Sequence, residues 1–473
     1  MLSGSQRSDF ADWLSPMLVK ELRQGMRSRI FVTAFYLTQL LMILSTVFSL
    51  LASTAEGAPG NIFGFLNWLF WFMIGVPLLF VMPLLGFGAL HAEMKARTLE
   101  LVFLTRLSAW RIVSGKWAAL MAETLLLVCS ILPYVILRYF LGGVDILEDL
   151  QGLFFLLVVS SLLTATTLAM SPYESKLVRA LFVLGLIFVF QSLIGLLFAW
   201  AAFSGAGASS GSSMAAWEVY VVLLVFVPAY ILLALEIAAS RIAPPAENHA
   251  VRKRLIGIYL LLIVPLLGYI MPNARGLHVI SLLLLAVVIV DGLAEPIESL
   301  RAVRRPFAGL GATGRALSLF FSPGWASASW YVLLVAGLGG VAMYSQSRLD
   351  DATEVLEYVS YLGALIFPAA LIRLVRPSAR YFLAFYVALQ GLFAVVTFFI
   401  GMMSGISNEP LTRWLSPIPN CVFLLGFSNQ ITAGQAAEFL RFTGLVTAGS
   451  LGILLVRAMT SRRESASVAK ATS

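Results

Sequence analysis

The chain has 473 residues, of which 60% are hydrophobic and 12% are charged, and its formal net charge is +8. Soluble domains contain about 45–50% apolar and about 25% charged residues, so this composition excludes a disordered chain and argues against a soluble globular protein. Three histidines and two cysteines exclude a disulfide-rich scaffold and a metal site built from a Cys/His cluster.

Twelve apolar runs are long enough to cross a bilayer, for which a helix needs about 20 residues. They are residues 30–52, 63–90, 118–140, 151–170, 180–203, 217–240, 255–271, 277–295, 328–344, 356–374, 381–404 and 437–459. We therefore predict an all-α polytopic membrane protein with about twelve transmembrane helices. A cytoplasmic linker at 241–254 separates two expected membrane domains, 30–240 and 255–459, of six spans each. Pro77 and Pro83 predict a kink in the second span.

The distribution of basic residues sets the predicted orientation. With a cytoplasmic N-terminus, 27 of the 32 lysines and arginines fall on the inner side and five on the outer side. Cytoplasmic segments of membrane proteins carry such an excess, so we place the tails 1–29 and 460–473 in the cytoplasm. The excess then faces the anionic inner leaflet and requires no nucleic acid partner. The first apolar run is longer than the core of a cleavable signal peptide, which has about 7–15 apolar residues, so we expect it to remain as a span.

Residues 12–29 have the periodicity of an amphipathic helix that lies in the inner membrane interface. The residues on its polar face are Lys20, Arg23, Gln24 and Arg27, and those on its apolar face are Leu14, Met17, Leu18, Leu22, Gly25 and Met26. Glu21 falls within the apolar face, where a simple positively charged anchor does not explain it. The pattern is compatible with two interpretations, a positively charged membrane anchor and a helix with a functional role.

The connection 91–117 is too charged for a span, yet its apolar residues at 99 and 101–104 are unusual for a solvated loop. A short helix with an exposed apolar patch would need either a partner protein or its own bundle to cover it.

Acidic residues within spans usually face a bundle interior and mark a pathway, because a buried charge is costly there. Glu123 in the third span and Glu236 in the sixth are the candidates, although each also lies close to an inner end. Asp291 and Glu295 end the eighth span and are expected to be solvated or paired with Arg301, Arg304 or Arg305.

The sequence offers no catalytic motif of its own. Residues 309–314 spell G-x-G-x-x-G but lack the preceding strand that a dinucleotide site requires, so we interpret them as a flexible linker without a nucleotide-hydrolysing role. The outer connection 405–436 contains an apolar stretch that would dip into the membrane or lie along it. In the last span Gly444, Ala448 and Gly452 are spaced for close helix packing.

Two stretches carry a family resemblance. Residues 15–29, S-P-M-L-V-K-E-L-R-Q-G-M-R-S-R, resemble the N-terminal interfacial helix of type-2 ATP-binding-cassette (ABC) transporter permeases. Glu93, 97–101 (R-T-L-E-L), 105–108 (T-R-L-S), 112–113 (I-V) and 115–116 (G-K) resemble the first cytoplasmic connection of that family, where a coupling helix docks on the ATPase subunit. The resemblance covers about residues 15–240, which is about half of the chain. A usual permease of the family has about six spans, whereas twelve are predicted for this whole chain.

The resemblance implies a non-enzymatic membrane subunit in the cell inner membrane, most simply an exporter, whose ATP is hydrolysed by a separate cytoplasmic ABC ATPase. It also allows a homodimer or a second permease subunit. The implied coupling residues are Glu93, Arg97, Thr98, Leu99, Glu100, Leu101, Leu107, Ser108 and Lys116. The implied interfacial-helix residues are Lys20, Glu21, Arg23 and Arg27, and the pathway candidates are Glu123 and Glu236. The alternatives are a secondary transporter driven by an ion gradient, with Glu123 as its candidate site, and a membrane enzyme acting on lipid-linked substrates.

Overall fold

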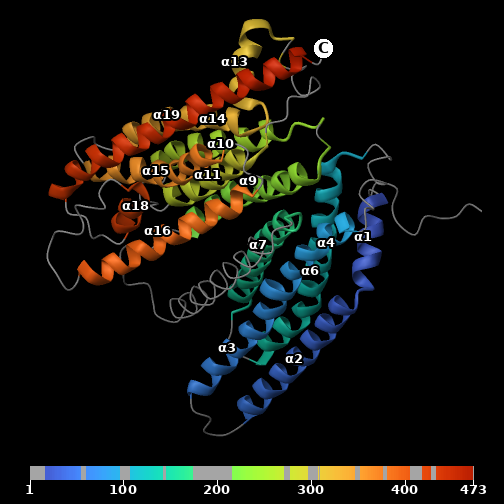
Figure 1. Ribbon diagram of the computed structural model, residues 1–473. Coiled ribbons are helices and arrows are strands. Elements are labelled where there is room, and N and C mark those ends of the chain that lie inside the picture. Colours follow the sequence, from blue (N-terminus) through green and yellow to red (C-terminus); the bar gives the residue numbers. More distant parts are fainter. Residues whose placement is uncertain are drawn as a thin grey trace, which may run out of the picture. The chain divides into compact units, whose positions relative to one another are not determined.

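The computed structural model describes residues 16–54, 60–95, 107–141, 145–173, 216–244, 246–270, 277–296, 307, 309–346, 352–376, 381–404, 418–427 and 433–471. Every regular element in these ranges is a helix (Figure 1). The chain divides into two compact units. One helix, Ala216–Ile242, has its first part in the second unit and its last part in the first unit. The first unit comprises Met1–Glu174, Arg179–Ser209 and Tyr230–Ala243, and the second comprises Ser175–Val178, Ser210–Ala229 and Pro244–Ser473.

The helices follow the apolar runs of the sequence closely. Before the unit boundary they are α1 (Pro16–Met26), α2 (Arg29–Thr54), α3 (Gly60–Val76), η1 (Pro77–Val81), α4 (Met82–Lys95), α6 (Ala109–Leu141) and α7 (Ile146–Met170), followed by the boundary helix α9 (Ala216–Ile242). The second unit continues with α10 (Ala250–Ile270), α11 (Leu277–Ala294), α13 (Gly311–Phe321), α14 (Trp325–Gln346), α15 (Ala352–Val375), α16 (Phe382–Ser404), α18 (Pro419–Phe427) and α19 (Ala433–Ala471).

Eight helices among the described residues are long and apolar enough to cross a membrane, or nine if α13 and α14, bent by 96° at their junction, form one broken span. The chain is therefore a multi-pass membrane protein. These eight coincide with eight of the twelve predicted runs. Of the others, 180–203 lies outside the described residues, 255–271 corresponds to α10, 328–344 lies within α14, and 277–295 forms α11 with a shorter apolar stretch at Ser281–Ala294.

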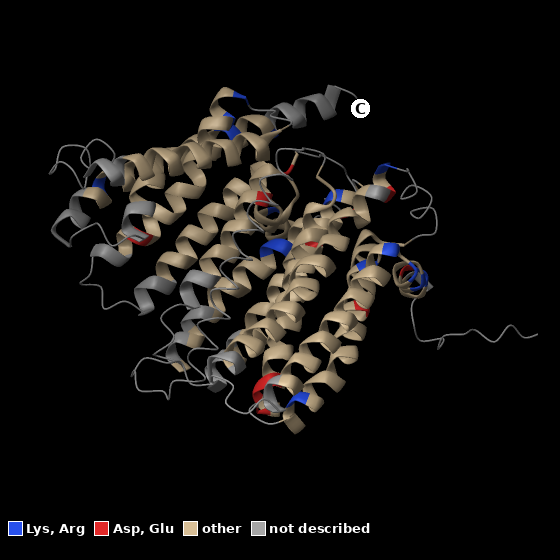
Figure 2. Cartoon of the chain, turned by 90° about the horizontal axis from the view of Figure 1, so that it is seen from below, with Lys and Arg blue, Asp and Glu red and all other residues tan. Residues whose placement is uncertain are grey.

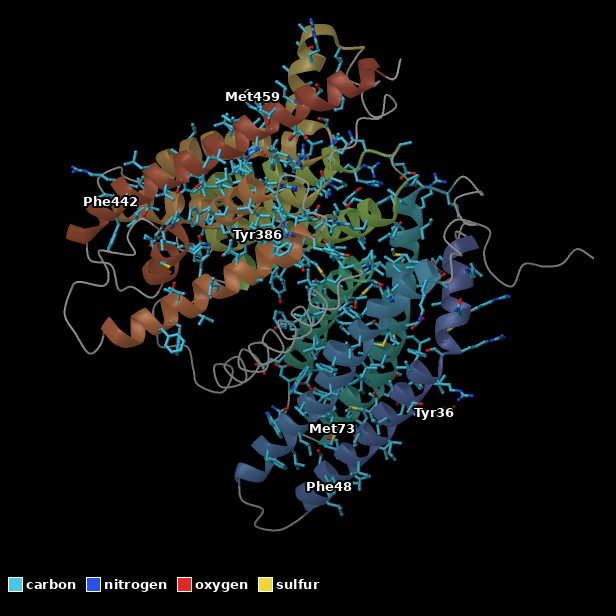
Figure 3. All side chains as sticks on the ribbon, in the orientation of Figure 1. Tyr36, Phe48, Met73, Tyr386, Phe442 and Met459 are labelled. Atoms are coloured by element: carbon cyan, nitrogen blue, oxygen red, sulfur yellow. The ribbon has the colours of Figure 1, made fainter. Side chains whose placement is uncertain are left out.

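Apolar side chains cover the outer surface of these helices as well as their interior. Tyr36 and Phe48 on α2 and Phe442 and Met459 on α19 are at least two-fifths exposed (Figure 3). Charged residues are sparse along the helices (Figure 2). Such a surface suits contact with lipid chains, in which exposed apolar atoms carry no penalty.

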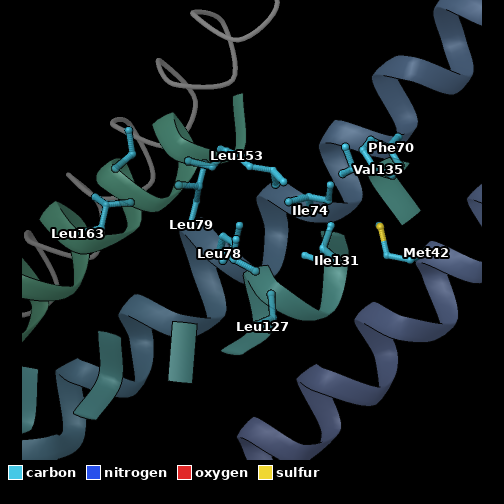
Figure 4. Packing of buried hydrophobic residues seen from close by; sticks show 13 residues of the cluster. Met42, Phe70, Ile74, Leu78, Leu79, Leu127, Ile131, Val135, Leu153 and Leu163 are labelled. Atoms are coloured by element: carbon cyan, nitrogen blue, oxygen red, sulfur yellow. The ribbon is translucent and has the colours of Figure 1, made fainter. Parts of the chain in front are cut away.

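The core of the first unit lies between α2, α3, η1, α6 and α7 (Figure 4). Its buried residues are Met42, Phe70, Ile74, Leu78, Leu79, Leu127, Val128, Ile131, Val135, Leu153, Leu156, Val159 and Leu163. Long aliphatic side chains from several helices interdigitate there, which fixes the helices against one another by dispersion contacts.

The predicted interruption at Pro77 and Pro83 is a π-helical turn, Pro77–Val81, in which the Met82 N–H bonds to the Pro77 carbonyl. In that register the carbonyl of Leu78 would face residue 83, but proline has no N–H to donate. The Ser160 hydroxyl on α7 donates to the Leu78 carbonyl instead, at 2.6 Å. A side chain from a neighbouring helix thus satisfies the freed backbone group, as a bilayer requires.

Two predictions about glycines are corrected. Residues 311–314 are not a linker, because they form the first turn of α13. This helix begins at Gly311, which has a φ of +61°. Within the described residues, Gly444 and Gly452 have nothing within 4 Å of an added Cβ, so they make no close helix crossing. The close approach on α19 occurs instead through Thr447, against Gly363 of α15.

Candidate functional site

Helix α1 is amphipathic as predicted, and its packing partner is α6 of the same unit, beside which it lies in Figure 1. Lys20, Arg23, Gln24 and Arg27 are exposed, whereas Leu18, Leu22, Gly25 and Met26 are partly buried. The polar face of α1 is therefore the exposed one, as in amphipathic helices that lie on a membrane surface.

Glu21, the exception on the apolar face, is explained by an ion pair. Its Oε2 lies 2.9 Å from the Nζ of Lys116 on α6, and the Oε1 of Glu93 on α4 lies 2.8 Å from the same nitrogen. The side chains of Lys116, Glu21 and Glu93 are 4%, 14% and 19% exposed. We call these three residues the Lys116 joint. It ties α1 to two helices of the bundle through one buried cation.

A second contact lies further along the same helix pair. A Cβ built on Gly25 would overlap Oε1 of Glu123, so the missing side chain is what lets the carboxylate lie against α1. Glu123 is 2% exposed. The contacts Glu21–Lys116 and Gly25–Glu123 occur in the same order on both helices, so α1 and α6 run in parallel here. Small residues at such a contact allow close helix approach.

The joint lies at the base of the predicted coupling segment. Helix α4 carries Glu93 and ends at Lys95, and α6 begins at Ala109, with Lys116 two turns later. Ser108 accepts a hydrogen bond from the Arg111 N–H at 3.4 Å and so caps α6, while Leu107 precedes it. The other coupling candidates, Arg97, Thr98, Leu99, Glu100 and Leu101, lie outside the described residues.

Glu236, the other pathway candidate, is buried on α9 with 2% of its surface exposed, in the part of that helix that belongs to the first unit. It is not a member of the Lys116 joint. The structure thus brings Glu21, Glu93, Lys116 and Glu123 to one helix junction and leaves Glu236 elsewhere on a separate helix.

The second unit contains a larger buried charge cluster that the sequence analysis did not identify. Lys253 on α10 pairs with Asp291 of α11, at 2.5 Å, and with Glu295. The adjacent Arg254 lies 3.4 Å from the other oxygen of Glu295. Lys253, Arg254 and Asp291 are at most 5% exposed, so the expectation of solvated acids is wrong for Asp291. Its described partner is a lysine from α10; Arg301, Arg304 and Arg305 lie outside the described residues.

Arg254 also holds the bend between α13 and α14. Its guanidinium donates to the carbonyls of Phe320 and Ser322 at the C-terminal end of α13. Glu295 accepts from the Gly324 N–H at 3.1 Å, at the N-terminal end of α14. A cation at a helix C-terminus and an anion at a helix N-terminus both complement the helix dipoles. The cluster therefore stabilises the broken α13–α14 pair and explains why two like charges are adjacent in sequence.

Among the described side chains no group of three or more His, Cys, Asp or Glu residues is arranged to hold a metal ion. What the Lys116 joint can do is mechanical, because it links three helices through charges that are expensive to separate.

The comparisons with known proteins add no assignment. No family model, no curated protein and no solved structure matches this chain.

Proposed function

We propose that this chain is the membrane subunit of a type-2 ABC-like transporter, lies in the cell inner membrane with both termini in the cytoplasm, and exports its substrate with ATP hydrolysed by a separate subunit. The observation that carries the proposal is the Lys116 joint, which connects the interfacial helix α1 with both helices that flank residues 96–106. The two stretches with the family resemblance are thus mechanically connected.

The proposed mechanism depends on three helices, α1, α4 and α6, and on the Lys116 joint that connects them. A partner that moves residues 96–106 pulls on the end of α4 and on the start of α6. Because Glu93 and Glu21 share the Lys116 ammonium, the same displacement also moves α1. Packed helices switch between discrete arrangements rather than deform continuously, so a small movement at the inner face alters the bundle. In this proposal the chain's own residues transmit force and perform no chemistry on ATP.

The first test is co-purification. The chain, tagged at its C-terminus and expressed with its native gene neighbourhood, is solubilised in mild detergent. We expect a stoichiometric ATPase to co-purify, and the double variant Glu100→Lys/Leu101→Asp to lose it while remaining inserted. The matched control is Arg315→Glu, a charge reversal at an exposed position of α13, which should retain the ATPase. A pure chain without any ATPase, or equal capture by both variants, would contradict the proposal.

A second candidate, an ion-gradient-driven transporter, is favoured by Glu123 alone. This carboxylate is buried in a candidate span. Buried acids of this kind serve as proton sites in transporters. Proteoliposomes containing only this chain distinguish the two functions. Transport driven by a proton gradient without ATP, and abolished by Glu123→Gln, would support the second candidate and refute the first.

A further inference from the structure

A proline inside α15 leaves a backbone acceptor without its helical donor within a candidate membrane span of the second unit. Pro368 has no N–H, so the carbonyl of Ala364, one turn earlier, lacks its helical partner. Two side-chain amides replace it. Gln390 Nε2 of α16 donates to the Ala364 carbonyl at 2.8 Å, and Asn420 Nδ2 of α18 donates at 2.9 Å.

These contacts fix the orientation of both amides and use all their N–H groups. Asn420 Nδ2 also donates to Gln390 Oε1 at 2.8 Å, and Gln390 Nε2 also donates to the Tyr386 hydroxyl at 3.0 Å. The Tyr386 hydroxyl in turn donates to the Leu365 carbonyl at 3.1 Å. What the cluster has left is acceptor capacity.

The unused acceptor is Oδ1 of Asn420, which is buried and has no hydrogen-bond partner among the described residues. Asn420 as a whole is 2% exposed. The Thr447 hydroxyl of α19 is likewise buried without a described partner. Thr447 lies beside Gly363, where an added Cβ would overlap Thr447 Oγ1 and come within 2.5 Å of Pro419 Cβ, in the residue before Asn420. The glycine lets α19, through Thr447, and α18, through Pro419, approach the same turn of α15.

The depth of this cluster is unusual for unsatisfied groups. Ala364 is the tenth of 21 residues in the span Val355–Val375, and Gln390 is the ninth of 18 in the span Phe382–Phe399. Helix α18, only nine residues long, packs against α15 and α16 at this level. An unsatisfied polar group costs several kcal/mol in hydrocarbon, and short helices at mid-membrane commonly border binding sites in transporters.

We propose that Asn420, Thr447 and the proline-containing turn Ala364–Pro368 of α15 form a binding site for an uncharged, hydroxyl-bearing ligand. The free Asn420 oxygen requires a hydrogen-bond donor. The partners of Asn420 and Gln390 are amides, hydroxyls and carbonyls. No carboxylate among these partners would balance a buried ammonium or metal ion, whose desolvation is far more expensive than that of a hydroxyl. The inference goes beyond the proposed function, because it holds whichever protein supplies the energy.

The chain provides its own reporter. It has two cysteines, and Cys421, next to Asn420, is fully buried. In the variant Cys129→Ser it is the only thiol. The experiment measures the rate of N-ethylmaleimide labelling of Cys421 in lipid nanodiscs against glycerol concentration, with NaCl as the ionic comparison. We expect slow labelling that saturating glycerol suppresses and NaCl does not change.

The variants Asn420→Leu and Thr447→Val test the assigned groups. Each removes one neutral hydrogen-bonding partner, so the glycerol concentration for half-protection should rise about fivefold. The control is Ser450→Ala on α19, whose hydroxyl bonds only within its own helix, to the Val446 carbonyl at 2.7 Å; it should leave protection unchanged. Thr447→Val keeps the shape of the side chain, so it remains informative if Asn420→Leu does not fold. A thiol inert in every condition, protection by sodium ions, or equal protection in all variants would overturn the proposal.

Discussion

Replacing Lys116 by methionine tests whether the Lys116 joint holds α1 against the bundle. Methionine has a similar length but no charge, so Glu21 and Glu93 would remain at the three-helix junction as two partly buried carboxylates without their shared cation. At 2.9 Å and an effective dielectric constant of about 20, each pair attracts by about 6 kcal/mol, which is offset by a desolvation penalty of several kcal/mol per ion. Removing one partner of a buried ion pair costs about 3–5 kcal/mol, and we expect a loss in this range.

The assay is a double-mutant cycle on the free energy of unfolding, measured for the purified protein by titration with sodium dodecyl sulfate in mixed micelles. Glu21→Gln keeps an acceptor for the lysine and should cost less, about 1–2 kcal/mol. In the Lys116→Met background the same substitution should cost nothing or stabilise, because it then removes an uncompensated charge. The coupling free energy is therefore expected to exceed about 1 kcal/mol.

Lys20→Met is the matched control, since it deletes a lysine charge next to Glu21 on a side chain that is 58% exposed. Its effect should stay below about 0.5 kcal/mol. If Lys116→Met and Lys20→Met destabilise equally, or if Glu21 and Lys116 show no coupling, then α1 is held by apolar packing and the argument from the joint fails.

The same unfolding measurement checks three further substitutions. Gly25→Ala places a Cβ on Glu123 and should destabilise by about 1–3 kcal/mol, whereas Gly64→Ala, with nothing within 4 Å, should not destabilise; equal losses would contradict the close packing of α1. Gly363→Ala should likewise cost about 1–3 kcal/mol by separating α15 from α18 and α19, and an unchanged stability would refute that packing. Arg254→Met should cost about 3–5 kcal/mol by leaving three carbonyls and Oε2 of Glu295 without the guanidinium, although Lys253 still pairs with Oε1, and a loss below about 1 kcal/mol would refute this role.

The surface of α1 was predictable because it depends on local periodicity. Placing residues at 100° intervals predicts which side chains of a helix share a face, and the exposed set Lys20, Arg23, Gln24 and Arg27 is confirmed. The partner of Glu21 was not predictable, because Lys116 lies 95 residues away and nothing in either stretch encodes their contact. The informative signal was the acid on the apolar face, which indicates a buried cation without identifying it.

The close helix contacts made by glycines, in contrast, were not predicted correctly from the sequence. The spacing of Gly444 and Gly452 predicted a close crossing, yet the described structure leaves open space beside both. Gly363, which belongs to no such spacing, accommodates Pro419 and Thr447. A glycine spacing shows that a helix can present a smooth face, but only the neighbouring helices decide where another backbone approaches.

The excess of lysine and arginine on the predicted inner side also has a second physical cause. Arg373 donates to the Leu293 carbonyl at the end of α11, and Arg457 donates to the Leu374 carbonyl at the end of α15. Arg254 and Arg462 do the same for carbonyls at the end of α13. The last carbonyls of a helix lack N–H partners and carry its negative dipole end, so cations gather where helices terminate. In the predicted orientation all these ends lie on the inner side, so part of the basic excess caps helices of the second unit instead of facing lipid headgroups or a partner protein.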